Sequence, residues 1–259
     1  MTDAQRAAGE YDVMALQYSA DNTAGSYNAY YERPATIALL GEVQGLRVLD
    51  VGCGGGQLSE WLAEQGAVVT AFDVSQAMVD IARARLGDRA SVLVADVAEP
   101  LFFAGKGEFD LVVVSLVMHY VRDWEEVLTE LRRVLSPRGA LVFSTHHPTM
   151  DWPLSCPEDY FAIKQVTDTW EKAGGEFQVT FWRRPLTAMC EAIFSAGFLI
   201  ERLVEPEPLA TLASHDPASY LELSTRPRFL FFRLRPSQEE VREGDDCRMT
   251  RAPAAESGP

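Results

Sequence analysis

The segment VLDVGCGGGQL, residues 48–58, constrains the fold of this chain more than any other stretch. An apolar run that contains Asp50 is followed by a glycine-dense turn, and an amphipathic segment then begins at Leu58. This order predicts a buried parallel strand, a tight turn and the N-terminus of a helix. Glycine adopts positive φ and lets a ligand approach the main chain, and free N–H groups lie at a helix N-terminus. The turn therefore suits a polar or anionic ligand group.

A second acid indicates which part of a ligand this turn would hold. Asp73 ends the next apolar run and lies about 20 residues after the turn, where a carboxylate accepts hydrogen bonds from both hydroxyls of a ribose. The dinucleotide fingerprint G-x-G-x-x-G needs Gly or Ala at its sixth position, which is Gln57 here. The sequence therefore predicts a ligand that contains a ribose, and it disfavours a nicotinamide dehydrogenase.

Residues 40–147 resemble the class I S-adenosylmethionine-dependent methyltransferases, of the type that acts on small molecules. The resemblance rests on five motifs in the order that this family uses: LDVGCGGG at 49–56, FDVS at 72–75, ADV at 95–97, FDLV at 109–112 and LSPRGA at 135–140. It implies a seven-stranded, doubly wound, Rossmann-like α/β sheet. It also implies S-adenosyl-L-methionine as cofactor and S-adenosyl-L-homocysteine as product.

The resemblance further implies which residues hold the cofactor. Asp96 would hold the adenine amino group, although a carboxylate there also serves as a turn or helix cap. Tyrosines of the N-terminal segment would lie near the methionine end, where their faces suit a sulfonium, or they only pack the helices onto the sheet. The predicted cofactor-binding residues are Tyr18, Tyr30, Arg33, Asp50, Gly52, Gly54, Asp73, Val74, Met78, Asp96, Val97, Ser115 and Leu116.

The chain divides into five predicted parts. Residues 1–44 form an N-terminal helical cap, in which residues 1–9 are frayed, and residues 45–147 form the cofactor-binding core. The core's fifth strand is expected at 140–145, after a break at 136–139. Residues 148–184 are a lid inserted after that strand, and residues 185–235 complete the core sheet. Residues 236–259 turn polar and mostly acidic, and are predicted to be disordered.

Histidines after the fourth and fifth strands are the candidate bases. His119 acts as a base or simply closes the cofactor pocket. His146 and His147, followed by Asp151, supply a base that titrates near neutral pH, or one bonds the backbone and the other is solvated. A metal site is disfavoured because Pro148 fixes the backbone and no further ligand is evident. Tyr18 and Tyr31 are candidates to assist.

Aromatic residues crowd the predicted lid. A flat apolar substrate suits such a wall, whereas a small satellite core or a dimer contact is the alternative. The segment 177–181 alternates and predicts an edge strand. The predicted substrate-binding residues are Trp152, Tyr160, Trp170 and Trp182.

Charge and missing motifs limit the partners of the chain. Its net charge of −15 is opposite to what a phosphate-tracking surface needs. Residues 115–117 read Ser-Leu-Val, where amino-methyltransferases of nucleic acids carry Asp/Asn-Pro-Pro, and the Pro-Cys nucleophile of cytosine C5 enzymes is also missing. No nucleic acid is therefore expected as substrate. Without a signal-like segment, a membrane-length apolar run or a C-x-x-C pair, the chain is expected to be cytoplasmic and not bound to a membrane. A monomer or a homodimer is expected.

The expected function is methyl transfer to an oxygen, nitrogen or nucleophilic ring carbon of a small aromatic or heteroaromatic metabolite. The substrate would resemble a phenol or an indole, belong to secondary metabolism and be deprotonated with the help of a histidine. Two alternatives are an RNA methyltransferase, for instance one acting on tRNA, and a protein of this fold that binds the cofactor without methyl transfer.

Overall fold

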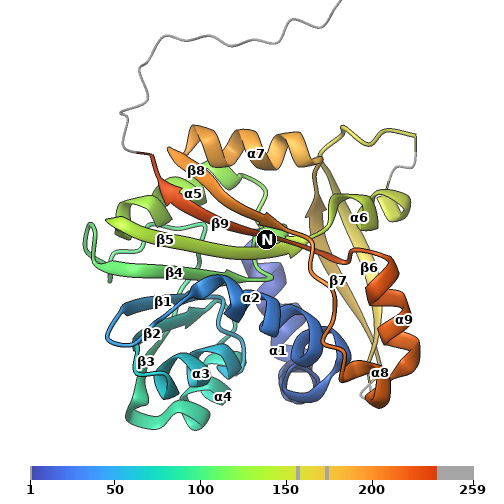
Figure 1. The fold of residues 1–259 in the computed structure, drawn as a ribbon, viewed down its shortest axis with the longest axis horizontal. Coiled ribbons are helices and arrows are strands. Elements are labelled where there is room, and N and C mark those ends of the chain that lie inside the picture. The colour runs from blue at the N-terminus through green and yellow to red at the C-terminus, as the bar shows by residue number, and fades with distance from the viewer. Residues whose placement is uncertain (1, 156–157, 173–174, 238–259) are drawn as a thin grey trace, which may run out of the picture.

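Seven strands form one mixed sheet in the order β3-β2-β1-β4-β5-β9-β8 (Figure 1). The computed structural model describes residues 2–155, 158–172 and 175–237. Strands β1 to β5 are parallel, and β9 runs antiparallel to both of its neighbours. The predicted seven-stranded doubly wound fold is confirmed. The strands are β1 Arg47–Val51, β2 Val68–Asp73, β3 Ala90–Val94, β4 Phe109–Ser115, β5 Leu135–His146, β8 Phe198–Val204 and β9 Phe229–Pro236.

Helices cover both faces of the sheet, so its central strands are apolar on both sides. Along β4, Leu111 and Val113 pack into one core and Val112 and Val114 into the other, as the period of two in a strand requires. The first core lies under α2 (Arg33–Leu40), α3 (Gln57–Glu64) and α4 (Gln76–Leu86). The second lies under α5 (Trp124–Val134) and α7 (Leu186–Ser195). No helix in the described ranges is both long and apolar enough to span a bilayer.

The N-terminal segment is helical from Asp3, so the prediction that residues 1–9 are frayed is wrong. Helix α1 (Asp3–Ala24) begins with a capping box, in which the Gln5 amide donates to Thr2 Oγ1 (3.1 Å) and the Thr2 amide donates to Gln5 Oε1 (3.0 Å). Such a box satisfies two N–H groups that otherwise have no partner. Asp3 also accepts a hydrogen bond from Trp182 Nε1 (2.8 Å), so the first turn of α1 is anchored to a residue that is far away in the sequence.

The segment after β5 forms its own small layer. Helix α6 (Pro148–Ser155) is followed by a hairpin of β6 (Lys164–Lys172) and β7 (Gly175–Arg183), which pair only with each other within the described chain. The strand predicted at 177–181 is confirmed as part of β7. The hairpin packs on α1 through Met14, Val179 and Phe181, so the insertion and the N-terminal helix lie side by side (Figure 1).

Two element boundaries differ from the predictions. Strand β5 starts at Leu135 and runs through the expected break, with a register irregularity opposite Phe109. A Cβ on Gly139 would lie 2.9 Å from the carbonyl oxygen of Asp110, so the glycine lets the two strands stay paired there. Strand β9 ends at Pro236, inside the predicted tail, and the rest of that tail from residue 238 lies outside the described residues.

Short elements complete the chain. A π-helical turn at Asn28–Glu32 joins α1 to α2, and a single 3-10 turn at Met118–Tyr120 follows β4. The helices α8 (Leu212–His215) and α9 (Pro217–Thr225) precede β9. A π-helical turn such as that at Asn28–Glu32 is rare and is frequently found at functional sites.

Candidate active site

A cavity of about 390 Å³ opens at the carboxyl ends of the central strands, beneath α1. Strand order reverses between β1 and β4, which is where open α/β sheets bind ligands. All the predicted cofactor-binding residues line this cavity except Tyr30. Those that line it are Tyr18, Arg33, Asp50, Gly52, Gly54, Asp73, Val74, Met78, Asp96, Val97, Ser115 and Leu116.

The glycine turn brings main chain against the cavity. Gly52 and Gly54 have φ values of 67° and 52°, which side chains other than glycine rarely adopt. A Cβ on Gly52 would lie only 2.2 Å from Cγ2 of Val117, whereas nothing lies within 4 Å of one on Gly54. Gly52 is therefore required both for its backbone conformation and for the close approach of the loop after β4.

We expect Gly52→Ala to weaken binding of S-adenosylhomocysteine at least about tenfold, because Val117 must move into the cavity to make room. Gly45→Ala is the matched control, since Gly45 also has positive φ (75°) but no atom lies within 4 Å of its added Cβ. Calorimetric titration of both variants measures the difference. Equal affinities would contradict the steric argument.

Asp73 is held rigidly at the end of β2. Its Oδ2 accepts from the Gly54 amide (2.9 Å), and its Oδ1 accepts from the Ser75 amide (2.9 Å). Burial raises the pKa of this carboxyl, while the backbone hydrogen bonds oppose the shift. Each carboxylate oxygen has a second lone pair, so the cavity side of Asp73 can accept two ribose hydroxyls.

An apolar slot with one polar edge lies beside Asp73. Phe72, Met78 and Val97 line it, and Asp96 stands at its edge with Oδ1 accepting from the Ala98 amide (2.9 Å). A purine ring needs apolar faces and a hydrogen-bond acceptor for its amino group. Together with the ribose acid, this chemistry fits the adenosine half of S-adenosylmethionine.

Asp50 is a buried carboxyl beneath the glycine turn. It accepts a hydrogen bond from Ser59 Oγ at 2.5 Å. Burial raises the pKa of Asp50 to about 7, and the nearby carboxylates of Asp73 and Glu32 add to the shift. The folded protein therefore keeps a proton on Asp50 at pH values where the unfolded chain has lost it.

This shift gives a pH dependence with a defined sign. Because the folded-state pKa lies above the model-peptide value of 3.8, the stability linked to the Asp50 proton is present below that value. It is lost as pH rises through about 7. We expect Asp50→Asn to lose less stability than wild type over that interval, as measured by urea unfolding at a series of pH values. Asp80→Asn, at an exposed position of α4, should behave like wild type, and parallel curves for Asp50→Asn and wild type would contradict the assignment.

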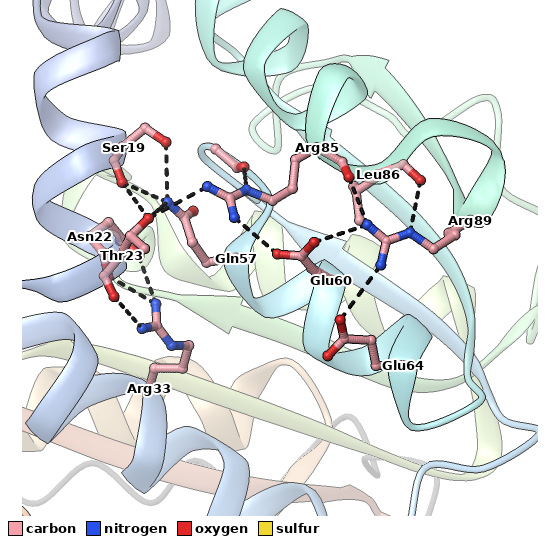
Figure 2. Close-up of polar contacts among 11 residues, drawn as sticks. Ser19, Asn22, Thr23, Arg33, Gln57, Glu60, Glu64, Arg85, Leu86 and Arg89 are labelled. Carbon is pink, nitrogen blue, oxygen red and sulfur yellow. Dashed lines mark hydrogen bonds and ion pairs between the residues drawn. The ribbon is translucent and has the colours of Figure 1, made fainter.

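Gln57 ties the helical cap to the glycine turn, as Figure 2 shows. Its Nε2 donates to the Ser19 carbonyl (2.8 Å) and contacts Thr23 Oγ1 at 3.1 Å, both on α1. Arg85 of α4 also holds the turn, because its Nε donates to the carbonyl of Gly55 (2.7 Å). The residue that departs from the dinucleotide fingerprint thus fixes α1 over the cavity.

Three tyrosines form one wall of the cavity. Tyr11 and Tyr120 share a hydrogen bond between their hydroxyls (2.7 Å), and the ring of Tyr11 meets that of Tyr18 edge-on at 4.9 Å. Burial raises the pKa of all three, so they stay protonated at neutral pH. Of the three, only Tyr18 was a predicted site residue. Tyr120 reaches the cavity through a 3-10 turn, which no local sequence pattern predicts.

The candidate histidines lie outside the lining of this cavity. His119 and His146 stack on each other with ring centroids 3.8 Å apart, and Phe181 of the hairpin covers them. His119 is buried, and burial together with His146 and Arg184 holds its pKa well below the usual value. Its Nδ1 has no hydrogen-bond partner among the described residues. His119 is therefore a neutral imidazole.

His147 faces a different environment from its neighbour. Its Nε2 lies 2.7 Å from Glu205 Oε1 and its Nδ1 lies 2.6 Å from Thr149 Oγ1. The two consecutive imidazoles do not converge. Within the described ranges, no three His, Cys, Asp or Glu side chains gather in a way that would hold a metal ion.

Two predicted tyrosines pack away from the cavity. Tyr30 stacks on His215 with centroids 5.0 Å apart. Tyr31 is fully buried, stacks on Phe229 at 5.5 Å and accepts a hydrogen bond from the Arg228 amide. The structure thus places Tyr30 against α8 and Tyr31 against the start of β9.

The four predicted lid aromatics also lie outside the cavity lining. Trp152 meets Tyr160 edge-on at 5.8 Å, and Trp170 packs against the hairpin core. Trp182 is bound to Asp3 and lies under the guanidinium of Arg122 at 5.4 Å. The Trp182 contacts join the hairpin to α1 and to the segment after β4. A substrate role for the four aromatic residues remains a prediction.

Known proteins share this fold and these motifs. Residues 49–143 match the family described as a methyltransferase domain. A crystal structure of an S-adenosylmethionine-dependent methyltransferase from Mesorhizobium loti superposes with a TM-score of 0.64 and 30% identity, over 79% of this chain and 97% of that one. An uncharacterised methyltransferase of Synechocystis is 31% identical over 60% of this chain and 73% of its own length.

The name of a third relative states the reaction that it catalyses. The ubiquinone biosynthesis O-methyltransferase of Pasteurella multocida is 34% identical over 47% of this chain, which spans only 55% of that enzyme. The glycine turn, Asp73 and the apolar slot beside it lie within the matched residues 49–143 and line one cavity. The chain belongs to the S-adenosylmethionine-dependent methyltransferase family, of class I.

Proposed function

We propose that this methyltransferase acts on an oxygen, nitrogen or nucleophilic ring carbon of a small aromatic or heteroaromatic metabolite. The observation that carries the proposal is the tyrosine wall formed by Tyr11, Tyr18 and Tyr120 in the same cavity as the cofactor residues. Ring faces and hydroxyls there suit a flat substrate with a polar edge. The named O-methyltransferase relative supports a hydroxyl as the first acceptor to test.

The protein's own contribution would be mainly orientation. The cofactor supplies an activated methyl group, and the acceptor must meet it in line. Holding both partners at reacting distance supplies about 7–11 kcal/mol of the barrier in well-aligned cases. The clamp of Gln57 on α1 and the rigid Asp73 fix the two sides of the cavity against each other.

A histidine would serve as base where the acceptor is a hydroxyl or a weakly acidic ring N–H. None of the three candidate histidines is among the residues that line the cavity, so such a base would act through a residue that does. We assign this role to His119 before His146 and His147. Its imidazole is neutral, its Nδ1 has no partner within the described chain, and its ring centroid lies 4.3 Å from that of the cavity residue Tyr120. His147 is engaged on both nitrogens. An amine acceptor would need no such base beyond its own deprotonation.

A small molecule is preferred to RNA because of charge. The net charge of the chain, −15, is opposite in sign to what binding to a phosphate backbone favours. An RNA acceptor, or cofactor binding without methyl transfer, are alternative outcomes of the same assay.

The test is a panel of phenols, catechols, indoles, amines and tRNA with S-adenosylmethionine, read as methylated product by mass. We expect product from a phenol or an indole, and a loss of about 100-fold in kcat for His119→Asn with unchanged binding of S-adenosylhomocysteine. His215→Asn, at an exposed position in α8, is the matched control. Product from tRNA alone, or none from any acceptor, would overturn the proposal. Full activity of His119→Asn would remove the histidine from it.

A further inference from the structure

Asp12 of α1 reaches the N-terminus of α4, which begins more than 60 residues further along the chain. Its Oδ1 accepts hydrogen bonds from Ser75 Oγ (2.5 Å) and from the Ala77 amide (3.2 Å). Asp12 is exposed, whereas Ser75 is fully buried. A carboxylate at a helix N-terminus gives a free N–H a partner and is stabilised by the helix dipole. Asp12 is thus a cap of α4 that comes from a different helix.

Ser75 connects Asp12 to the residues of the cofactor site. Its amide donates to Asp73 Oδ1 (2.9 Å), and its Oγ accepts from the Met78 amide (3.1 Å). Because the Ser75 hydroxyl donates its one proton to Asp12, a lone pair is left for Met78. Burial raises the pKa of Asp73, and the nearby charge of Asp12 adds to the shift. Asp12 therefore acts on the ribose acid and on the floor of the apolar slot without lining the cavity itself.

Helix α1 covers the cavity along almost its whole length. Its lining residues run from Asp3 to Asn22, and the helix spans Asp3–Ala24. Near the middle of the helix, Tyr11 lines the cavity while Asp12, the next residue, bonds α4. A cofactor in this cavity therefore lies between the strand ends and α1, and it exchanges with solvent most readily when α1 moves away.

The two sides of α1 make contacts of different kinds. On the hairpin side, Met14 packs with Val179 and Phe181 in a buried apolar cluster. On the other side, α1 is held by hydrogen bonds, from Asp12 to α4 and from Gln57 to its last turns. Among the described residues, the two larger apolar clusters include no residue of α1. Water replaces exposed hydrogen bonds at little net cost, whereas buried apolar surfaces resist separation, so α1 would leave the core along its α4 side.

We propose that Asp12 is a positioning residue that holds α1 closed over the bound cofactor. Its bonds to Ser75 and Ala77 open each time the cofactor is exchanged, and α1 then pivots on the hairpin. Both partners of this contact belong to the protein, so the contact is equally strong with and without ligand. It sets how fast the cofactor enters and leaves, and not how tightly it binds. The inference rests on the cofactor of the family and not on the identity of the acceptor.

The test measures the two rate constants of S-adenosylhomocysteine separately. Surface plasmon resonance on the full-length protein gives the association and dissociation rate constants, and calorimetric titration gives Kd. We expect Asp12→Ala to raise both rate constants about tenfold, because α1 loses its charged contact with α4. Kd should stay within about twofold of the wild-type value. Asp88→Ala, which removes an exposed carboxylate in the 3-10 turn after α4, should leave both rate constants unchanged.

The variant Asp12→Asn tests the same contact with a smaller change. Its side-chain oxygen still accepts from Ser75 and Ala77 but carries no charge. We expect both rate constants to rise by the same factor, about threefold. This variant keeps the proposal testable even if Asp12→Ala fails to fold.

Two results would overturn the proposal. A faster dissociation with unchanged association would weaken binding, and would mean that Asp12 shapes the occupied site and does not control its opening. Unchanged rate constants in folded Asp12→Ala would mean that the cofactor passes beside α1 without displacing it. Neither result bears on which acceptor is methylated.

Discussion

Asp73→Ala should lose at least about 100-fold in affinity for S-adenosylhomocysteine, which corresponds to about 2.7 kcal/mol. Hydrogen bonds to a charged group contribute about 1.5–3 kcal/mol each, and the ribose offers two donors. The variant also frees the amides of Gly54 and Ser75, which Asp73 holds at 2.9 Å. The ligand site therefore loses both its acceptor and the bond that fixes the glycine turn. Calorimetric titration measures this directly.

Asp73→Asn separates the two contributions. An amide oxygen still accepts one backbone bond but carries no charge, so we expect a loss between that of the alanine variant and wild type. Asp80→Asn, outside the cavity lining, should bind normally. Thermal unfolding confirms that the variants are folded at the titration temperature. Micromolar binding by folded Asp73→Ala would show that another residue holds the ribose.

Trp124→Ala should destabilise the protein by about 3–5 kcal/mol. Trp124 is 1% exposed, its ring meets Phe143 edge-on at 5.5 Å, and the buried guanidinium of Arg184 lies 4.5 Å above it. Its Nε1 donates to the carbonyl of Met118 at 2.7 Å. Truncation leaves a large cavity and an arginine without its aromatic partner, and the Met118 carbonyl keeps only the hydrogen bond from the Val121 amide (3.1 Å), which together explain so large a loss. Urea unfolding measures it.

Two further variants provide an exposed control and separate the packing of Trp124 from its hydrogen bond. Phe102→Ala, at a position that is 92% exposed, should change the free energy of unfolding by less than about 0.5 kcal/mol. Trp124→Phe retains most of the apolar contact but cannot donate to Met118, and should cost about 1–3 kcal/mol. Similar losses for Trp124→Ala and Trp124→Phe would mean that the hydrogen bond, rather than the packing, dominates.

The fate of the histidines shows where sequence reasoning stops. His146 and His147 are neighbours in sequence, but successive side chains of an extended chain point to opposite sides. One therefore stacks on His119 and the other reaches Glu205. Their surroundings come from the hairpin and from the loop after β8, which no local pattern near residue 146 specifies.

The N-terminal cap shows the same limit and one missed signal. The T-x-x-Q capping box at Thr2 was readable in the sequence and predicts the start of α1. The roles of Tyr11 and Asp12 were not readable, because each depends on a partner about 60 to 110 residues away, Tyr120 or Ser75.

The sequence by itself determined the sheet, the glycine turn and the place of Asp73 at the end of β2. Apolar runs, glycine positions and the spacing from Gly52 to Asp73 are local properties, and a parallel α/β sheet brings the strand ends to one edge whatever the rest of the chain does. Only the tertiary structure decided which side chains close that edge. Glu32, Gln57 and Tyr120 reach the cavity through a π-turn, a helix clamp and a 3-10 turn. Their positions follow from packing between distant segments, which local sequence periodicity does not encode.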